Sequence, residues 1–217
     1  MFSLQLPELR PELDKLHNIF GAKNLKPIYG AGCVKNPRVM FIFMNPTGRN
    51  ISANASWNGL RAPWLGTKVI WNLFNELKLI SNQSFIEIQK RNSEDWTPEF
   101  AYNLYHQLDK KRVYVTNLAK CTQADARHLS NSLFQRYLST LLREIEIINP
   151  ESIIAFGNQV SSVLLGKNIS VSDYSDKKKE LLKIGEKTYN VYPVYYPVGQ
   201  GRRNIHKAIS RVRLIIG

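Results

Sequence analysis

Short apolar runs, each bounded by polar or turn-forming residues, are the clearest pattern in this chain. The run at residues 39–44, VMFIFM, is apolar throughout, which is typical of a strand that is covered on both faces. It stops at the polar segment NPTGRN, whose Pro and Gly predict a tight loop at the carboxyl end of the strand. Runs of the same kind predict four strands in all, at residues 39–44, 113–118, 152–156 and 189–195.

The segments between these runs have the spacing of amphipathic helices. Val69, Leu73 and Leu77 recur at four-residue steps within residues 68–79 and form one apolar stripe. The sequence Thr-Pro-Glu at residues 97–99 predicts an N-cap, a first helical proline and an acidic first turn. Helices are therefore predicted over residues 68–79, 97–108, 133–148, 158–165 (with Asn158 as the cap) and 204–215. The polar segments 81–96 and 167–187 are interpreted as exposed connections.

Strands that alternate with helices predict an α/β fold. We expect a three-layer α/β/α sandwich with a mainly parallel four-stranded sheet, forming one domain over residues 1–217. In such a sheet the carboxyl ends of the strands meet at one edge, where ligands bind. The polar loops that follow the strands are therefore the candidate site.

The charge balance of the chain indicates a polyanionic partner. Thirty Lys and Arg against seventeen Asp and Glu leave a net charge of +13 and a sequence pI near 9.8. Such an excess attracts DNA or RNA. An A/T-rich genome that favours Lys and Asn codons would raise the pI without any binding role, and this alternative stays open. No apolar run is long enough to cross a bilayer and no signal-peptide pattern follows Met1, so a soluble, cytoplasmic, monomeric protein is expected.

The residue types that bind metals or phosphates are sparse. Cys33 and Cys121 cannot form a disulfide framework, and neither they nor the four histidines have metal-ligand spacing, so no metal is expected. A glycine-rich nucleotide-binding motif is absent, which argues against a simple nucleotide-binding module. Asp125 and Glu99 are the acids considered as a general base, and the sequence assigns that role to neither.

Two amides and one aromatic ring fall in loops at the predicted strand ends. Asn45 follows the first strand, Asn117 closes the second, and Trp64 precedes a helix between them. An asparagine amide pairs bidentately with a base edge, and an indole face supplies a stacking surface, so the three predict a pocket for a nucleobase. The structural alternatives are a turn-forming Asn45, a Trp64 that fills space, and an Asn117 bonded to neighbouring backbone.

These motifs resemble the uracil-DNA glycosylase superfamily over residues 38–66 and 113–213. The stretch FMNPT at residues 43–47 resembles the GMNPG motif of the single-strand-selective branch, and PWLG at 63–66 resembles a PFVG stretch whose ring stacks on the flipped base. Residues 113–121, VYVTNLAKC, resemble the thermostable branch, in which an asparagine reads the uracil edge. Residues 149–157 also have a counterpart there.

The chain departs from the family at three places. The family's His-Pro-Ser motif, in which the histidine polarises uracil O2, is replaced by Tyr196 followed by Pro and Val. Thr47 stands where the single-strand-selective branch has glycine. The thermostable branch binds an iron–sulfur cluster through four cysteines, of which Cys121 matches one while Tyr137 stands near another, so no cluster or other cofactor is expected.

The resemblance implies a glycosylase that hydrolyses the N-glycosidic bond of a flipped uracil or similar deaminated base during base-excision repair. It implies catalysis by Asn45 and Tyr196, base binding by Met44, Pro46, Trp64 and Asn117, and DNA binding by Thr47, Lys120, Gly199, Gln200, Arg202 and Arg203. The final helix is expected to extend the basic surface through Lys207, Arg211 and Arg213. A scaffold that binds nucleic acid but has lost turnover remains the alternative, because the family's histidine is missing.

Overall fold

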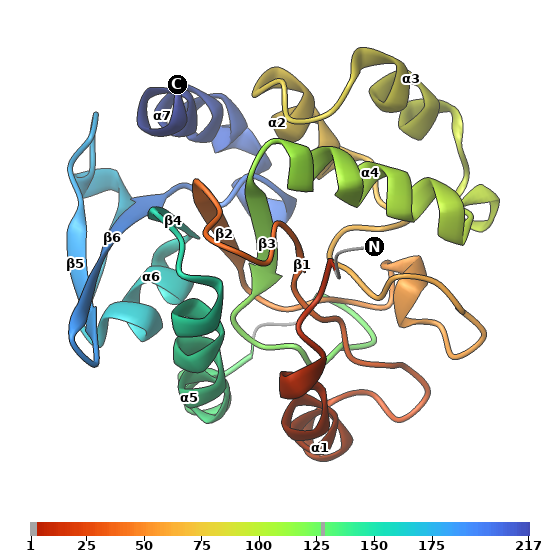
Figure 1. The fold of residues 1–217 in the computed structure, drawn as a ribbon, viewed down its shortest axis with the longest axis horizontal. Helices are drawn as coiled ribbons and strands as arrows, with labels where there is room; N and C mark the ends of the chain where they lie inside the picture. Colours follow the sequence, from red (N-terminus) through yellow and green to blue (C-terminus); the bar gives the residue numbers. More distant parts are fainter. Residues whose placement is uncertain (1–3, 127–128) are drawn as a thin grey trace.

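The computed structural model of the protein, which describes residues 4–126 and 129–217, has one mixed sheet at its centre (Figure 1). The sheet has six strands in the order β1-β3-β2-β4-β6-β5. The four inner strands are parallel, and the two edge strands run antiparallel to their neighbours. The strands are β1 (Ala31–Gly32), β2 (Val39–Phe43), β3 (Val113–Asn117), β4 (Ser152–Phe156), β5 (Glu180–Ile184) and β6 (Lys187–Val194).

The mixed α/β architecture is confirmed, but the prediction of a four-stranded sheet is wrong. The four predicted strands form the parallel centre, and β1 and β5 add an antiparallel strand at each edge. β1 is only two residues long, too short for any periodicity to show. β5 alternates half-buried and exposed side chains within the polar segment 167–187, which had the composition of an exposed connection.

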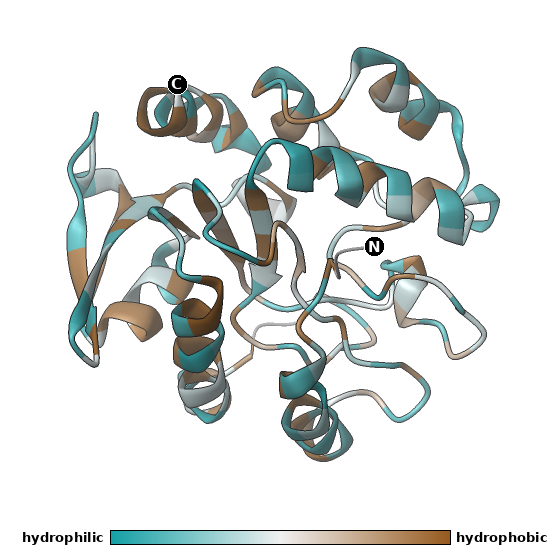
Figure 2. Cartoon of the chain, viewed as in Figure 1, coloured by the Kyte–Doolittle hydropathy of each residue, from teal (hydrophilic) through white to brown (hydrophobic). Residues whose placement is uncertain are grey.

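Helices cover both faces of the sheet. Figure 1 shows α2, α3, α4 and α7 on one side and α1, α5 and α6 on the other. Each side has its own apolar core, and Figure 2 shows hydrophobic residues in the central strands. The helices are α1 (Arg10–Phe20), α2 (Val69–Glu76), α3 (Asn82–Lys90), α4 (Pro98–Lys110), α5 (Asn131–Ile148), α6 (Asn158–Leu165) and α7 (Ile205–Ile216). Of the helices in the described part of the chain, none combines the length and apolar character needed to cross a membrane.

Helix ends follow the local signals in most cases. Thr97 caps α4 as predicted, because its side chain accepts a hydrogen bond from the Phe100 N–H (3.2 Å). The predicted cap of α6 is wrong. Gly157 holds that position, and the Asn158 side chain instead accepts from the Val171 N–H (3.0 Å). The two helices without a predicted counterpart, α1 and α3, lie in polar parts of the chain.

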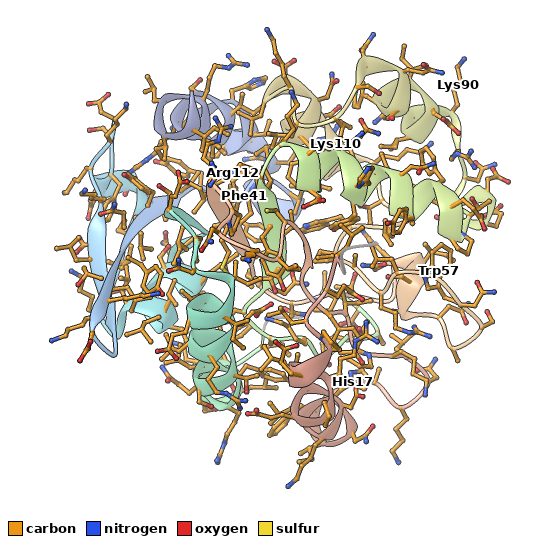
Figure 3. All side chains as sticks on the ribbon, in the orientation of Figure 1. His17, Phe41, Trp57, Lys90, Lys110 and Arg112 are labelled. Carbon is orange, nitrogen blue, oxygen red and sulfur yellow. The ribbon has the colours of Figure 1, made fainter. Side chains whose placement is uncertain are left out.

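Helix α1 is attached to the segment that follows β3 through a buried histidine. His17 is 4% exposed, and its Nε2 lies 2.8 Å from the Leu25 carbonyl oxygen, so the proton is assigned to that nitrogen. Its Nδ1 accepts from the Thr122 N–H at 3.4 Å. Both ring nitrogens are therefore satisfied by the neutral imidazole. Figure 3 labels His17 on α1, on the opposite side of the sheet from Lys90 of α3.

This arrangement predicts a loss of stability in mild acid. Burial lowers the pKa of His17 below its ordinary value of 6.5. Below pH 6.5 the unfolded chain then binds a proton that the folded protein does not, so the free energy of unfolding falls as the pH drops towards the folded pKa. The loss reaches at most about 1.4 kcal/mol per pH unit from this group. Urea unfolding at pH 7.5, 6.5 and 5.5 measures it, and His17→Gln should flatten the dependence. Equal slopes in both proteins would contradict the assignment.

Candidate functional site

The loops that follow β2 and β3 run side by side beyond the sheet. The Leu118 N–H donates to the Phe43 carbonyl (2.7 Å), which continues the parallel pairing past the last strand residues. Farther along, the Gln123 N–H donates to the Pro46 carbonyl (3.1 Å). Asn45 lies between these two attachments. The backbone that carries it is therefore held at both ends by the segment that begins with Asn117.

The Asn45 side chain is half-buried and only partly used by the protein. Its Nδ2 donates to the carbonyl of the next residue, Pro46, at 3.1 Å. Its Oδ1 makes no hydrogen bond within the described residues. An amide oxygen with two lone pairs is thus open at the end of β2, where it can accept a hydrogen bond from a ligand or a water.

Asn117, the last residue of β3, carries a buried donor without a partner. The residue is 2% exposed, and its Nδ2 has no hydrogen-bond partner in the described part of the chain. It pairs in register with Phe43 of β2. Because side chains alternate along a strand, Asn117 shares a face with Val113 and Val115, which belong to the same core as Phe43. Leaving such a donor unpaired costs about 1 to 3 kcal/mol, so the amide is poised for a group from outside the protein.

Phe43 is the centre of an aromatic group on that face. Phe156 stacks on its ring at 4.4 Å, Trp64 meets it edge-on at 4.9 Å, and Tyr196 does the same at 6.2 Å. Trp64 and Tyr196 are both only half-buried, whereas Phe43 and Phe156 are fully buried. The register thus brings the Asn117 amide beside the ring against which Trp64 and Tyr196 pack.

Trp64 has an unusual backbone conformation. Its φ is +70°, in the left-handed region that bulky residues rarely adopt, and such conformations cost about 1 to 3 kcal/mol. The turn is held because the Trp64 carbonyl accepts from Thr67 Oγ1 (2.7 Å) and from Trp71 Nε1 (3.2 Å). Its own Nε1 is buried and has no partner among the described residues. Strain of this kind clusters at functional sites.

Tyr196, one of the rings around Phe43, carries a neutral phenol. Burial raises the pKa of Tyr196, and a hydrogen bond from the Met44 backbone opposes part of that shift. The phenol therefore stays protonated at neutral pH. A Cβ added to Gly201 would lie 2.0 Å from the Tyr196 carbonyl oxygen, so close approach of the backbone requires glycine there.

The other predicted residues of the site differ in exposure. Gly199, Arg202 and Arg203 are exposed on the short 3-10 helix η5 (Gly199–Asn204), while the side chain of Gln200 lies outside the described part of the structure. Three further residues lie in the loop after β2: Met44 packs its half-buried side chain against the core on the side of α1, α5 and α6, Pro46 is buried, and Thr47 is half-buried.

The prediction that Lys120 contacts DNA is wrong. Lys120 is 1% exposed, and its Nζ donates to Glu144 Oε2 of α5 (2.6 Å) and to the Asn117 carbonyl (2.5 Å). The other oxygen of Glu144 accepts from the hydroxyls of Tyr114 (2.8 Å) and Thr116 (3.0 Å). Lys120 therefore ties the backbone of Asn117 to α5. The sequence carries one signal of this pairing, because Glu144 interrupts the apolar face of its helix.

The basic surface expected along the final helix is also smaller than predicted. Arg211 is 6% exposed and donates to the carbonyls of Tyr174 and Lys178 (2.7 Å for the latter). Burial lowers the pKa of Arg211, which nonetheless stays charged at neutral pH. The guanidinium anchors the segment before β5 to α7. Lys207 and Arg213 remain exposed.

The cysteines do not fit a four-cysteine cluster. Cys121 is fully buried, and its Sγ accepts from Gln123 Nε2 at 3.6 Å. Cys33 lies at the opposite end of β3, where its N–H donates to the Val113 carbonyl (2.9 Å). Burial raises the pKa of both thiols. Among the described residues there is no group of three or more His, Cys, Asp or Glu that could hold a metal ion.

Comparison with known proteins finds one family and a distant relative. Residues 29–212 match the family model described as the uracil DNA glycosylase superfamily. The chain is also similar to the type-4 uracil-DNA glycosylase of Sulfurisphaera tokodaii, with 28% identity over 93 residues. That alignment spans 42% of this chain and 42% of the relative's length.

Proposed function

Because the chain belongs to the uracil-DNA glycosylase superfamily, we propose that it is a DNA glycosylase that acts on a flipped, deaminated base, with uracil as the first candidate. The reaction is hydrolysis of the N-glycosidic bond. The C1′–N bond breaks with its electron pair leaving on the base, and a water oxygen bonds to C1′. One proton of that water is released to solvent or to the base.

The unpaired Asn117 Nδ2 is the observation that carries this proposal. A buried donor at the end of a parallel strand suits the carbonyl edge of a base that enters from DNA. The neighbouring half-buried ring of Trp64 suits stacking on the same base. Both groups adjoin Phe43, so one base would meet them together.

The remaining residues would act on the water and the leaving base. Asn45 would orient the attacking water through its open Oδ1, and its Nδ2 is already fixed by the Pro46 carbonyl. Tyr196 would stand by the leaving base as a neutral donor. Fixed dipoles of this kind stabilise the developing charges without a carboxylate base, a metal or a redox cofactor.

DNA would meet the protein along the same edge. We propose that Thr47, Gly199, Gln200, Arg202 and Arg203 contact its backbone, because the described members of this set are exposed or half-buried in the loop after β2 or on η5. The net charge of +13 would speed the encounter. The whole chain would act as one domain, as a monomer and in the cytoplasm.

A base-release assay tests the proposal. The protein is incubated with single-stranded and duplex oligonucleotides that contain uracil, hypoxanthine, xanthine or mismatched thymine, and free base is measured by chromatography. We expect release from at least the uracil substrate. Absence of release from every substrate, together with salt-sensitive binding to DNA, would instead favour the scaffold without turnover. The replacement of the family histidine by Tyr196 makes that the second candidate.

A variant of Asn117 separates a functional role from a structural one. Asn117→Ala removes a buried donor that has no protein partner and whose burial is itself costly, so the free energy of unfolding should not fall by more than about 1 kcal/mol. Release of base should nevertheless fall about 100-fold, the scale for loss of one preorganised donor. Chemical denaturation and single-turnover kinetics measure the two effects. A large loss of stability with unchanged release would assign Asn117 to the fold instead.

A further inference from the structure

A groove between α2 and α7 opens beside the candidate site. It has a volume of about 550 Å³. Val69, Ile205 and Ile209 supply apolar lining, while Arg202 and His206 supply cationic or polar lining. The groove thus combines an apolar surface with basic groups, within the size range of about 300 to 1,000 Å³ that binds small organic ligands.

One end of the groove adjoins the site, and an ion pair lines the other end. Val69 begins α2 immediately after the loop that carries Trp64, and Arg202 belongs to η5, which follows Tyr196. At the far end Arg213 Nη2 donates to the Glu76 carbonyl (2.9 Å) and lies 3.3 Å from Glu76 Oε2. A chain that enters from the site therefore meets this pair after a short distance.

The charge in the groove is uncompensated near the site. Arg202 and His206 are exposed, and their side chains make no hydrogen bond or ion pair with the residues that the structure describes. Glu76, the acidic residue of the lining, is paired with Arg213. The positive charge that remains is that of Arg202, at the end that faces the loops of the site, where it can attract a phosphate.

We propose that this groove binds one nucleotide that neighbours the flipped base on the same DNA strand. Its phosphate lies at Arg202, and its base lies on the apolar surface of Ile205 and Ile209 beside His206. This inference rests on the proposed action on DNA and adds a second nucleotide site to it. The groove suits a single strand, because a duplex is wider than a gap between two packed helices, and the acidic Glu76 at the far end disfavours a second phosphate.

Binding of oligonucleotides of increasing length tests the groove. A fluorescent strand with a non-hydrolysable abasic analogue is extended by one nucleotide at a time on either side, and the dissociation constant is measured by anisotropy. We expect a gain of about tenfold from the first nucleotide on one side only, followed by a plateau. Equal gains on both sides, or a steady increase with length, would overturn the proposal.

Two variants identify the contacts. Arg202→Ala should abolish most of that gain and reduce the slope of log affinity against log salt by about 0.7, the value for one phosphate on a single strand. Ser210→Trp, which fills the groove, should abolish the gain without changing the slope. Lys183→Ala removes an exposed charge from β5 at the sheet edge and is the matched control. If Lys183→Ala reduced the gain and the salt slope as much as Arg202→Ala does, both effects would reflect the overall charge of the protein and the groove would be excluded as their cause.

The assay is independent of turnover. Suppose that the protein releases no base, but that affinity rises on one side only and Arg202→Ala abolishes this gain. The groove proposal would then stand and the glycosylase proposal would be wrong. If the protein releases uracil but shows neither the one-sided gain nor its loss in Arg202→Ala, the groove proposal would be wrong and the glycosylase proposal would stand.

Discussion

Asn45→Ala is expected to lower the rate of uracil release about 100-fold or more, because the attacking water then loses the acceptor that orients it. The open Oδ1 at the end of β2 is the group removed, and its neighbour Nδ2 makes one hydrogen bond to a loop carbonyl. Stability should fall by no more than about 1 kcal/mol, the usual value of one such bond. Single-turnover release under saturating enzyme measures the chemical step.

Two further variants make this prediction specific. Asn45→Asp keeps an acceptor oxygen at the same position and should retain much more activity than the alanine variant, since a carboxylate accepts hydrogen bonds at least as well as an amide. Asn82→Ala, at an exposed position that begins α3, is the matched control and should behave as wild type. If the alanine and aspartate variants were equally impaired, orientation of water by Oδ1 would be the wrong role for Asn45.

Glu144→Leu is expected to destabilise the fold by about 3 to 5 kcal/mol, the cost of leaving a buried charge without its partner. Lys120 Nζ would keep only the Asn117 carbonyl, and the hydroxyls of Tyr114 and Thr116 would lose their acceptor. Burial lowers the pKa of Lys120, and the Glu144 carboxylate opposes that shift, so its removal would favour the neutral amine. Urea denaturation at pH 7 measures the loss.

The double variant Lys120→Met/Glu144→Leu tests whether the loss comes from the unpaired charge. Replacing both partners by apolar groups of similar volume is often close to neutral, so the double variant should recover much of the stability lost by the single variant. The hydroxyls of Tyr114 and Thr116 would remain unpaired, which limits the recovery. If the stability lost by the double variant equalled the sum of the losses of Lys120→Met and Glu144→Leu, the broken ion pair would not be the cause of the destabilisation.

The parallel centre of the sheet could be predicted because its signal is local. Strands covered on both faces form nearly continuous apolar runs, and β2 and β3 each consist of five buried residues. The predicted boundaries of β4 coincide with the observed Ser152–Phe156, and Thr97 marks the start of α4 through a contact three residues away. These features depend on neighbours along the chain.

The edges of the fold could not be predicted in the same way. β5 pairs with β6, in a register that joins Glu180 to Val191, but its short apolar stretch lies inside the polar segment 167–187, which hides it in the sequence. β1 owes its conformation to β3, with Ala31 opposite Val115. In both strands hydrogen bonds from a partner outweigh a weak local preference.

The amino-acid sequence by itself determined which polar groups end the central strands, and so placed Asn45 and Asn117 at the carboxyl ends of two of them. Only the tertiary structure decided which positive charges remain available to bind DNA. Lys120 is paired with Glu144, 24 residues away in the sequence, and Arg211 donates hydrogen bonds to carbonyls of a distant segment. It also decided the left-handed turn at Trp64. The reason is physical: apolar runs and caps act between chain neighbours, whereas desolvation and ion pairing depend on groups that only folding brings together.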